Sequence, residues 1–431
     1  MRWTHQISSA LLALVVVSPA LAQQDKTPAP GATPQQAVPL DEIRRYVTVF
    51  NAVRAAYVEP VADSKLMQSA IRGLLLELDP HSSYLDAEQA KVFEEQSRGA
   101  YEGIGVEVQT LKDKVLKVIA PIEGGPAAAA GVLPGDLIVA VDGKQMAAIT
   151  DVEPLRGPTG SSVTLGIRRE GQAKLLEIVV QRQTIRLSSV RSRLLEPQYG
   201  YIRISTFQAD TATDFAQHAK RLGEQSAEPL KGLVLDLRSN PGGLLTAAVQ
   251  IADELLEQGT IVSTRGRLSS SDSHFEATAG QLLPGTDLMV LVDAGSASAS
   301  EVLAAALADN QRARIIGSRT FGKGSVQSVL PLDNGDSIKL TTARYYTPSG
   351  RSIQAVGISP DIVLSPEASN AAAGDYREAG LGGHLEGELE QENAGLPSGD
   401  FLPGDKPIEQ ALAALKAPPG QAAPADVTPA E

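Results

Sequence analysis

The stretch that decides the fold is residues 289–327, MVLVDAGSASASEVLAAALADNQRARIIGSRTFGKGSVQ. Its apolar run at 289–292 ends in small residues and is followed by an Ala- and Leu-rich segment, a pattern that predicts a strand, a tight turn and a helix. Ser296, Ser298 and Ser300 lie in this turn. We therefore expect a strand to deliver serine side chains to the start of a helix.

A lysine follows after the next predicted strand. The apolar run at 314–317 leads to Phe321-Gly322-Lys323-Gly324, whose glycines let the backbone pack closely around the lysine. Serine at a helix start and lysine in such a turn are the parts of a Ser-Lys nucleophile pair. The lysine pKa must fall from about 10.4 to roughly 7–8, and burial lowers it. Gln327 is expected on the same strand face as Lys323, where its amide can orient the amine without adding charge.

Other interpretations of these residues are plainer. Ser298-Ala299-Ser300-Glu301 has the S-x-x-E form of a capping box, so the pattern alone makes Ser298 a helix cap. Residues 317–323 fit the first positions of a phosphate-binding loop. Gly324 then lacks the hydroxyl that this loop needs for magnesium, and the following residues alternate like a strand where the loop requires a helix.

Two places supply backbone amides for an anion. The apolar run at 231–237, KGLVLDL, predicts a strand buried on both faces of an α/β core, and Arg238-Ser239-Asn240-Pro241-Gly242-Gly243 joins it to a predicted helix at 244–256. Bare amides at Gly242 and Gly243 can point at an anion, although the stretch alone is also a plain strand-to-helix turn. Ala299 lies at a helix start, where free amides can stabilise an oxyanion.

Composition limits the function classes. The chain has 431 residues, which predicts about two or three domains, and a formal net charge of −13. This charge argues against nucleic acid or an anionic membrane as the main partner and leaves peptides open. The chain contains no cysteine, which excludes disulfides and thiolate nucleophiles.

The first residues predict export. Arg2 precedes a short apolar core at 11–17, and Ala20-Leu21-Ala22 has the form of a signal-peptidase site. We expect a signal peptide at 1–22 with cleavage after Ala22, because the apolar core is too short for a membrane span of about 20 residues. A flexible linker is predicted at 23–40, and apolar periodicity predicts a helical region at 41–99.

Residues 100–185 carry short apolar runs and three glycine-containing motifs. The runs, at 106–108, 115–119, 137–141 and 163–167, predict short strands. The motifs are Tyr101-Glu102-Gly103-Ile104-Gly105-Val106, then Gly125-Pro126-Ala127-Ala128-Ala129-Ala130-Gly131 with Leu133-Pro134-Gly135-Asp136, and then Leu155-Arg156-Gly157-Pro158 with Gly160. Their order resembles that of a PDZ domain. The resemblance implies that the loop amides of Gly103, Ile104, Gly105 and Val106 receive a peptide's terminal carboxylate.

Strands and helices alternate through the predicted core at 186–365. A strand at 199–204, a helix at 213–222 and a hairpin around Asn334-Gly335 are expected. The tail at 366–431 carries a short amphipathic pattern around Ile408, Leu412 and Leu415. We interpret this pattern as a frayed terminus, with an oligomer contact as the alternative.

Taken together, the signal sequence, the PDZ motifs and the segments at 238–243, 295–301 and 321–327 resemble the carboxyl-terminal processing proteases, also called tail-specific proteases. The resemblance covers about 41–365. It implies Ser298 as nucleophile, Lys323 as base and Gln327 as its support, with oxyanion donors at Ala299 and at Gly242 or Gly243.

The same resemblance implies a fold, a cellular location and partners for the protein. We expect an α/β core of the crotonase-like ββα-superhelix type with an inserted PDZ domain and an N-terminal helical region. The protein would cleave protein substrates near their C-termini in the periplasm without a cofactor or metal. Self-association into a homo-oligomer and help from an adaptor lipoprotein are further expectations of the resemblance.

Two competing functions are weaker. A trypsin-like protease needs histidine and aspartate ahead of its serine, and His81, His218, His274 and His384 lie in no recognisable catalytic context. The sequence contains no HExxH motif, so it does not indicate a metal hydrolase. A catalytically inactive PDZ scaffold, the non-enzyme alternative, would leave Lys323 and the Gly242-Gly243 pair unexplained.

Overall fold

The computed structural model describes residues 39–111, 114–146, 153–365, 376–389, 398–417 and 427–429. The predicted signal peptide at 1–22 and all but the end of the predicted linker at 23–40 lie outside these residues. The chain divides into two compact units, Met1–Met67 and Gln68–Glu431. Among the described residues, no helix has the length and apolar character that crossing a membrane requires.

The first unit contains α1 (Leu40–Ala56) and the start of α2 (Asp63–Leu76), so both predicted helices are confirmed. The Tyr46 hydroxyl donates a hydrogen bond to Met67 Sδ at 3.1 Å. No residue of α1 is buried, and Ile43, Val47 and Val53 remain exposed. An amphipathic helix is stabilised mainly by burying its apolar face, and α1 leaves that face uncovered.

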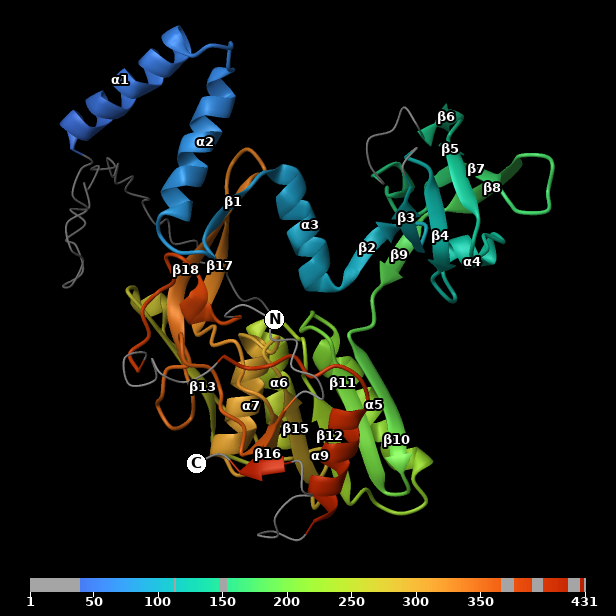
Figure 1. Ribbon diagram of the computed structural model, residues 1–431, viewed down its shortest axis with the longest axis vertical. Helices are drawn as coiled ribbons and strands as arrows, with labels where there is room; N and C mark the ends of the chain where they lie inside the picture. The colour runs from blue at the N-terminus through green and yellow to red at the C-terminus, as the bar shows by residue number, and fades with distance from the viewer. Residues whose placement is uncertain are drawn as a thin grey trace, which may run out of the picture. The chain divides into compact units, whose positions relative to one another are not determined.

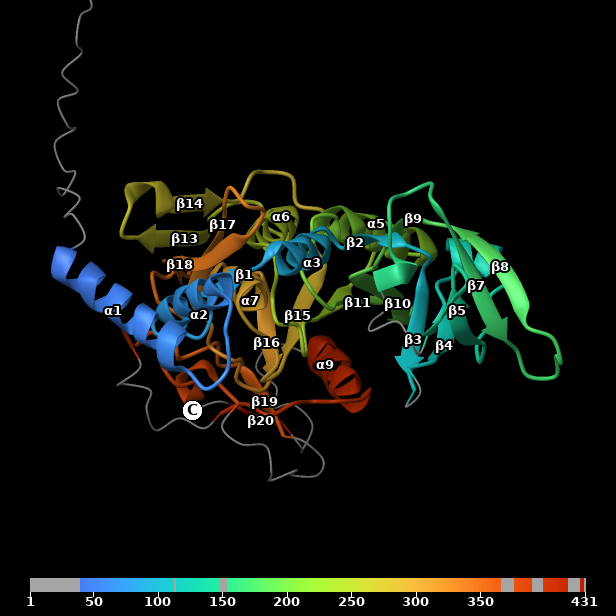
Figure 2. The ribbon, with the colours of Figure 1, turned by 90° about the horizontal axis from the view of Figure 1, so that it is seen from above.

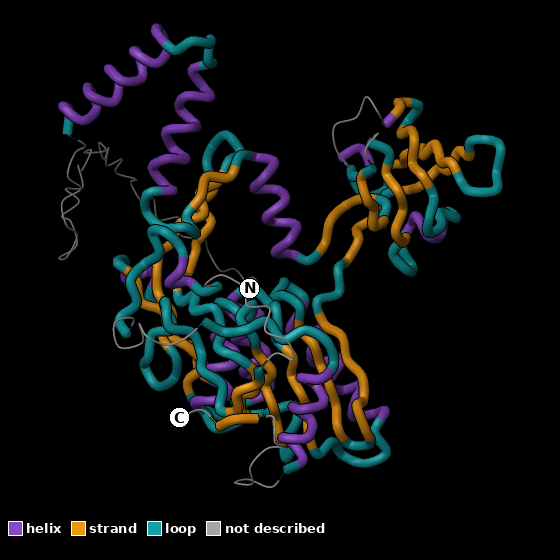
Figure 3. Tube along the Cα trace, in the orientation of Figure 1, coloured by secondary structure: helices purple, strands orange, loops and turns teal. Residues whose placement is uncertain are grey.

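The PDZ part of the second unit is an antiparallel sheet in the order β3-β4-β5-β7-β8, which confirms the predicted strands. Its interior includes the fully buried side chains Ile104, Val118 and Leu165. The chain enters and leaves through an antiparallel ribbon of β2 (Ala100–Gly103) and β9 (Gln183–Arg186) (Figure 3). The elements are β3 (Val106–Thr110), β4 (Leu116–Pro121), α4 (Pro126–Ala129), β5 (Leu137–Val141), β6 (Lys144–Gln145), a 3-10 turn (Glu153–Leu155), β7 (Ser162–Arg168) and β8 (Leu176–Gln181).

The central layer of the remaining fold is a seven-stranded sheet in the order β10-β11-β12-β15-β16-β19-β20. Figure 1 labels its strands β10, β11, β12, β15 and β16. The strands from β11 to β19 are parallel, and the outer strands β10 and β20 run antiparallel to their neighbours. The strands are β10 (Val190–Glu196), β11 (Tyr199–Ile204), β12 (Gly232–Asp236), β15 (Asp287–Val292), β16 (Ala313–Gly317), β19 (Ile362–Leu364) and β20 (Val427–Pro429).

Helices cover both faces of this sheet (Figure 2). On one face α5 (Thr211–Gln225), α6 (Leu245–Leu255) and α7 (Ala299–Asp309) pack in one apolar cluster with Leu233 and Leu235. Val234 points to the other face, where it packs with α9 (Lys406–Lys416). Apart from the exposed Lys231, the segment at 231–237 is thus buried on both faces, as predicted.

The prediction of a frayed terminus is wrong for α9. Its residues Ile408, Ala411, Ala414 and Leu415 are buried against the sheet. The sequence did not indicate this contact, because an amphipathic pattern shows that a helix has an apolar face but does not show which surface covers it.

A second, antiparallel sheet carries the lysine region. Its order is β1-β18-β13-β14, and β17 also pairs with β18, which confirms the predicted hairpin. The strand β1 (Ser83–Leu85) pairs Ser83 with Lys339 of β18 and was not predicted, because three residues are too few for a periodic pattern. The other elements are α3 (Ala87–Arg98), β13 (Thr260–Gly266), β14 (Ser273–Glu276), β17 (Ser325–Pro331), β18 (Ser337–Tyr346) and short 3-10 turns at Ser269–Ser271 and Glu378–Gly380.

Candidate active site

The predicted strand, turn and helix form β15, the serine turn and α7. The three serines of the turn have different surroundings. Ser296 Oγ donates to the Leu237 carbonyl at 2.8 Å, and Ser300 Oγ donates to the Asn240 carbonyl at 2.9 Å. Both side chains are fully buried. Ser298 instead lines a cavity, so it alone of the three can meet a substrate.

Ser298 has a strained backbone. Its φ of 55° and ψ of −114° lie in a region that side chains disfavour, at a cost of order 1–3 kcal/mol. Residue 242 lies so close that a Cβ there would be 2.9 Å from Ser298 Cβ, which explains why glycine occupies it. Strain at a sharp strand-to-helix turn is typical of nucleophile positions that expose their oxygen.

The cavity beside Ser298 has a volume of about 370 Å³ and is lined by both members of the predicted pair. Lys323 Nζ donates to Gln327 Oε1 at 2.6 Å. Burial lowers the pKa of the Lys323 amine to about 8, and the positive charge of Lys339 acts in the same direction. Other lining residues are Phe93, Phe207, Gly242, Gly243, Leu244, Leu245, Val326 and Tyr345.

Ser298 and Lys323 share the cavity but are not joined directly. Between these two described residues there is no hydrogen bond; the lysine amine donates to Gln327 instead. Burial raises the pKa of Tyr345 to about 12, and a side-chain hydrogen bond with Ser298 lowers this pKa by a smaller amount. Tyr345 therefore stays neutral beside the serine. Sequence reasoning missed this residue, because nothing in the pattern of β18 distinguishes it from other core tyrosines.

Glu301 connects the serine turn, residues 293–298, to the turn at 321–324 that carries Lys323, which we call the lysine turn. Its carboxylate accepts hydrogen bonds from the backbone N–H groups of Ser298 at 2.7 Å, Gly322 at 2.7 Å and Lys323 at 2.9 Å. Burial raises the pKa of Glu301 to about 7, although these hydrogen bonds oppose the rise. The S-x-x-E pattern predicted the contact with Ser298. It contained no signal for the contacts with the lysine turn.

The structure distinguishes the two candidate glycine amides. The Gly242 N–H donates to Asn240 Oδ1 at 2.9 Å, so it already has an acceptor. Within the described parts of the chain, the N–H groups of Gly243 and Ala299 have no hydrogen-bond acceptor. An added Cβ at residue 242 would lie 3.0 Å from Ala299 N. The turn at 241–243, which we call the glycine turn, is therefore in contact with the start of α7.

A buried ion pair supports the glycine turn. Arg238 Nη2 lies 2.7 Å from Asp236 Oδ2, at the end of β12. The same guanidinium donates to the Gly404 carbonyl at 2.9 Å and to the Leu402 carbonyl. The segment after residue 398 therefore helps to hold the turn that carries Gly243, a role that the sequence did not indicate.

The predicted carboxylate loop of the PDZ domain lies between β2 and β3. The Ile104 carbonyl accepts from Ala127 N–H, and the Gly105 carbonyl accepts from Ile122 N–H, both at 2.9 Å. Among the described residues, no acceptor is bound to the N–H groups of Ile104 or Gly105. Val106 begins β3, an edge strand that pairs only with β4.

The capping-box interpretation is confirmed, because the Glu301 carboxylate accepts from the Ser298 N–H at 2.7 Å at the start of α7. The other two competing interpretations find no support in these positions. Residues after Lys323 form the strand β17, whereas a phosphate-binding loop requires a helix there. His81 Nε2 contacts Glu378 Oε2 at 2.8 Å, and His218 Nδ1 contacts Ser192 Oγ at 2.7 Å. In the described part of the chain, neither histidine is bonded to Ser298.

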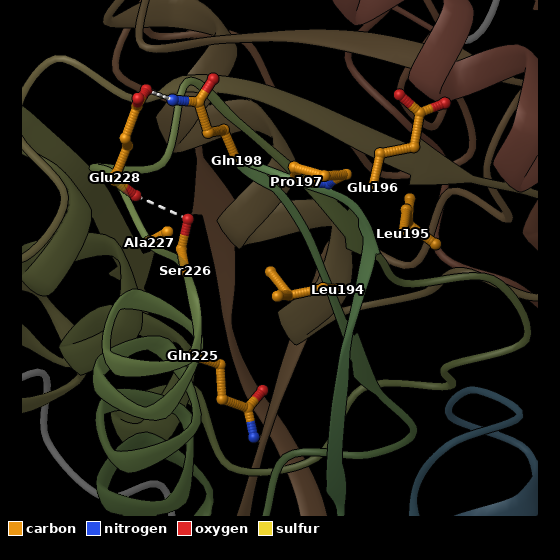
Figure 4. A pocket seen from close by; sticks show the side chains of 9 residues that line it. All are labelled: Leu194, Leu195, Glu196, Pro197, Gln198, Gln225, Ser226, Ala227 and Glu228. Atoms are coloured by element: carbon orange, nitrogen blue, oxygen red, sulfur yellow. Dashed lines mark hydrogen bonds between the residues drawn. The ribbon is translucent and has the colours of Figure 1, made fainter.

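A larger cavity, of about 620 Å³, lies at the β10–β11 turn (Figure 4). In this cavity Gln198 contacts Glu228, and Ser226 Oγ donates to the Glu228 carbonyl. Among the described residues, no lysine or histidine lines the cavity, so none there can act as a base for its serine. The smaller cavity is therefore the candidate active site.

Comparison with known families finds three matches along the chain. Residues 198–364 match Peptidase family S41, residues 117–169 match a PDZ domain, and residues 13–89 match the activating protease CtpB N-terminal domain.

Known proteins are similar over most of the chain. A carboxy-terminal-processing protease of Bartonella bacilliformis is 44% identical over 84% of this chain and 85% of its own length. A carboxyl-terminal-processing protease of Synechocystis is 38% identical, over 72% of this chain and 74% of its own. The solved photosystem II D1 C-terminal processing protease is 31% identical, with a TM-score of 0.43, over 76% of this chain and 94% of that one.

Proposed function

Since the chain belongs to the carboxy-terminal-processing proteases of peptidase family S41, we propose that Ser298 is its nucleophile and Lys323 its general base. One observation carries this proposal: a strained, cavity-lining serine shares its cavity with a partly buried lysine of lowered pKa. Serine needs a neighbouring base, and a lysine with a pKa of about 8 is partly unprotonated near neutral pH.

The reaction begins when Ser298 Oγ attacks the scissile carbonyl and transfers its proton to Lys323 Nζ. For this step the amine must approach the hydroxyl, which is now bonded to Tyr345. The neutral amine can keep one N–H on Gln327 Oε1 while its lone pair faces Ser298. The protonated lysine then gives the proton to the leaving amine, and water hydrolyses the acyl-enzyme by the same route.

The free amides of Ala299 and Gly243 suit the negative oxygen of the tetrahedral intermediate. Both lie beside Ser298, one following it in the chain and the other in the adjoining glycine turn. Donors that are fixed before the reaction stabilise developing charge most effectively. Gly242, the other glycine that the resemblance offered, is the weaker candidate because its N–H is bonded to Asn240.

The PDZ domain is proposed to bind the C-terminus of the protein substrate. The free N–H groups of Ile104 and Gly105 suit a terminal carboxylate, and Gly103 and Val106 flank them. The open edge of β3 can take the peptide as an additional strand. Apolar lining of the catalytic cavity by Phe207 and Leu244 suits an apolar substrate side chain.

Location and assembly complete the proposal. The predicted signal peptide, cleaved after Ala22, would place the protease in the periplasm. The uncovered apolar face of α1 supports self-association, because soluble helices rarely leave such a face exposed. Help from an adaptor lipoprotein rests on the resemblance alone.

Alanine substitution of each serine tests the proposal, with unfolded β-casein as substrate. Ser298→Ala and Lys323→Ala are expected to abolish cleavage. Ser296→Ala and Ser300→Ala are matched controls that should lower the melting temperature but keep cleavage, because their hydroxyls bond backbone carbonyls. Cleavage that survives Ser298→Ala would refute the proposal, whereas a parent protein that cleaves no substrate would favour the inactive PDZ scaffold.

A further inference from the structure

Hydrogen bonds continue from Gln327, on the side away from Lys323, to a buried carboxylate. Gln327 Nε2 donates to Thr341 Oγ1 at 3.2 Å, and Thr341 Oγ1 donates to Asp79 Oδ1 at 3.1 Å. Asp79 lies in the turn between α2 and β1, and the pairing of β1 with β18 brings this turn to Thr341. A residue far away in the chain thus connects to the support of the proposed base.

Among the described residues, the hydrogen-bond donors to the Asp79 carboxylate are all neutral groups. The carboxylate accepts from His81 N at 2.8 Å, Ser82 N at 2.9 Å and Ser82 Oγ at 2.7 Å, besides Thr341. Burial by itself would raise the Asp79 pKa, but these hydrogen bonds outweigh it and lower the pKa below its usual range. The group is 4% exposed and ionised at neutral pH. Burying such a charge is costly, which calls for a reason beyond packing.

An ionised carboxylate can only accept hydrogen bonds. It therefore fixes which group donates and which accepts in each hydrogen bond from Asp79 to Lys323. The Thr341 hydroxyl has one proton and gives it to Asp79, which leaves its oxygen as an acceptor. The group of Gln327 that faces Thr341 must therefore be the NH₂ group. The amide oxygen of Gln327 is then the group that faces Lys323, as the 2.6 Å contact requires.

The opposite amide orientation would disable a lysine base. With its NH₂ group toward Lys323, Gln327 would donate a hydrogen bond into the lone pair of the neutral amine. That lone pair must accept the Ser298 proton. Orienting the amide therefore matters more for the reaction than for folding, since either end of the amide fills the same space.

We propose that Asp79 and Thr341 are positioning residues that hold the Gln327 amide with its oxygen toward Lys323 and so keep the lysine lone pair available to Ser298. The inference rests on the proposed roles of Ser298 and Lys323. Neither positioning residue touches the substrate.

Substitutions at Thr341 test the hydrogen-bond direction. Thr341→Val keeps the shape and removes the hydroxyl, and kcat for β-casein should fall on the order of 10- to 100-fold with KM little changed. Thr341→Ser restores the hydroxyl and should recover most of the activity. Thr342→Val is the matched control on the same strand, because the Thr342 hydroxyl contacts Ser328 instead. Asp79→Leu removes the acceptor and should lower kcat as Thr341→Val does.

The pH profile separates positioning from general damage. In Asp79→Leu and Thr341→Val a donor on the lysine lone pair stabilises the neutral amine, so the acid limb of kcat/KM should move to lower pH. Loss of the Asp79 charge acts in the same direction. The charged groups acting on Lys323 are Lys339, Glu378, Glu301 and Asp79, and the first three are unchanged in both variants.

Each outcome is decisive. Equal losses in Thr341→Ser and Thr341→Val, or kcat within twofold of the parent in both Asp79→Leu and Thr341→Val, would overturn the inference. If Asp79→Leu fails to fold by thermal unfolding, the two Thr341 variants decide alone. Full cleavage by Ser298→Ala or Lys323→Ala would instead remove the proposed function, a result that the Thr341 series cannot mimic.

Discussion

The glycine turn at 241–243 and the glycine loop at 103–106 both present free backbone N–H groups, but different neighbours hold the two backbones. A Cβ added at Gly243 would lie 2.1 Å from the Phe207 carbonyl oxygen, which belongs to the backbone. A Cβ added at Gly105 would lie 2.9 Å from Ile185 Cδ1, the far end of a side chain. The first position is fixed by the core, and the second can give way.

This difference matches the two proposed ligands. A transition-state oxyanion exists at one place for an instant, so its donors must be fixed in advance. A peptide carboxylate belongs to a bound ground state, and a loop at the edge of a sheet can adapt to peptides of different sequence. The four predictions below test this contrast.

The largest effect is expected from Gly243→Ala. The added methyl group must displace the turn from Phe207, which moves the free N–H away from the substrate oxygen. Loss of one oxyanion donor costs on the order of 10²- to 10³-fold in kcat. Steady-state kinetics and peptide binding by fluorescence anisotropy would check it. Weakened peptide binding together with unchanged kcat would contradict the assignment of the glycine turn to the oxyanion and of the glycine loop to the peptide.

Gly105→Ala should weaken capture of substrate and leave the chemistry intact. Its φ of 71° disfavours a side chain, so the loop should shift, and KM should rise about tenfold for a peptide with a free terminal carboxylate. The same peptide with an amidated C-terminus is the control, because it should gain nothing from the loop in either protein. A fall in kcat equal to that of Gly243→Ala would contradict the prediction.

The pH dependence should belong to the catalytic cavity alone. Because Lys323 acts only when unprotonated and its pKa is lowered from 10.5 to about 8, kcat/KM should rise with pH and level off above about 8. Gly105→Ala should keep the same profile. Gln327→Glu adds a negative charge that favours protonated lysine, so its acid limb should move to higher pH. A limb that stays in place would argue against Lys323 as the base.

The smallest effect concerns the strain at Ser298. Glycine tolerates a φ of 55° and a ψ of −114°, whereas alanine keeps the steric conflict. Ser298→Gly should therefore be more stable than Ser298→Ala by about 1 kcal/mol, with both inactive. Chemical denaturation of the two variants measures the difference. Equal stability would mean that the turn relaxes when the hydroxyl is removed.

Several features of the site followed from local patterns. The run at 289–292, the serine turn and the helix after it were predicted in order, and the structure has β15 and α7 there. Lys323 and Gln327 are four residues apart, and their hydrogen bond agrees with the predicted orientation of the amine. Such contacts depend on periodicity and short spacing, which a sequence displays directly.

Other features depend on contacts between distant segments. Glu301 reaches Lys323 across 22 residues, and Asp79 reaches Thr341 across 262. The choice between the amides of Gly242 and Gly243 depends on which way each N–H points, which residue type does not reveal.

The sequence by itself predicted most of the strands and helices (although not β1), the candidates for nucleophile, base and amide donors, and the burial of the segment at 232–237. Only the tertiary structure decided which serine meets the cavity, which glycine N–H remains free, what covers α9 and what lies behind Gln327. The physical reason is that hydrophobic periodicity acts along one element. Hydrogen-bond partners and cavities are set by the packing of several elements together.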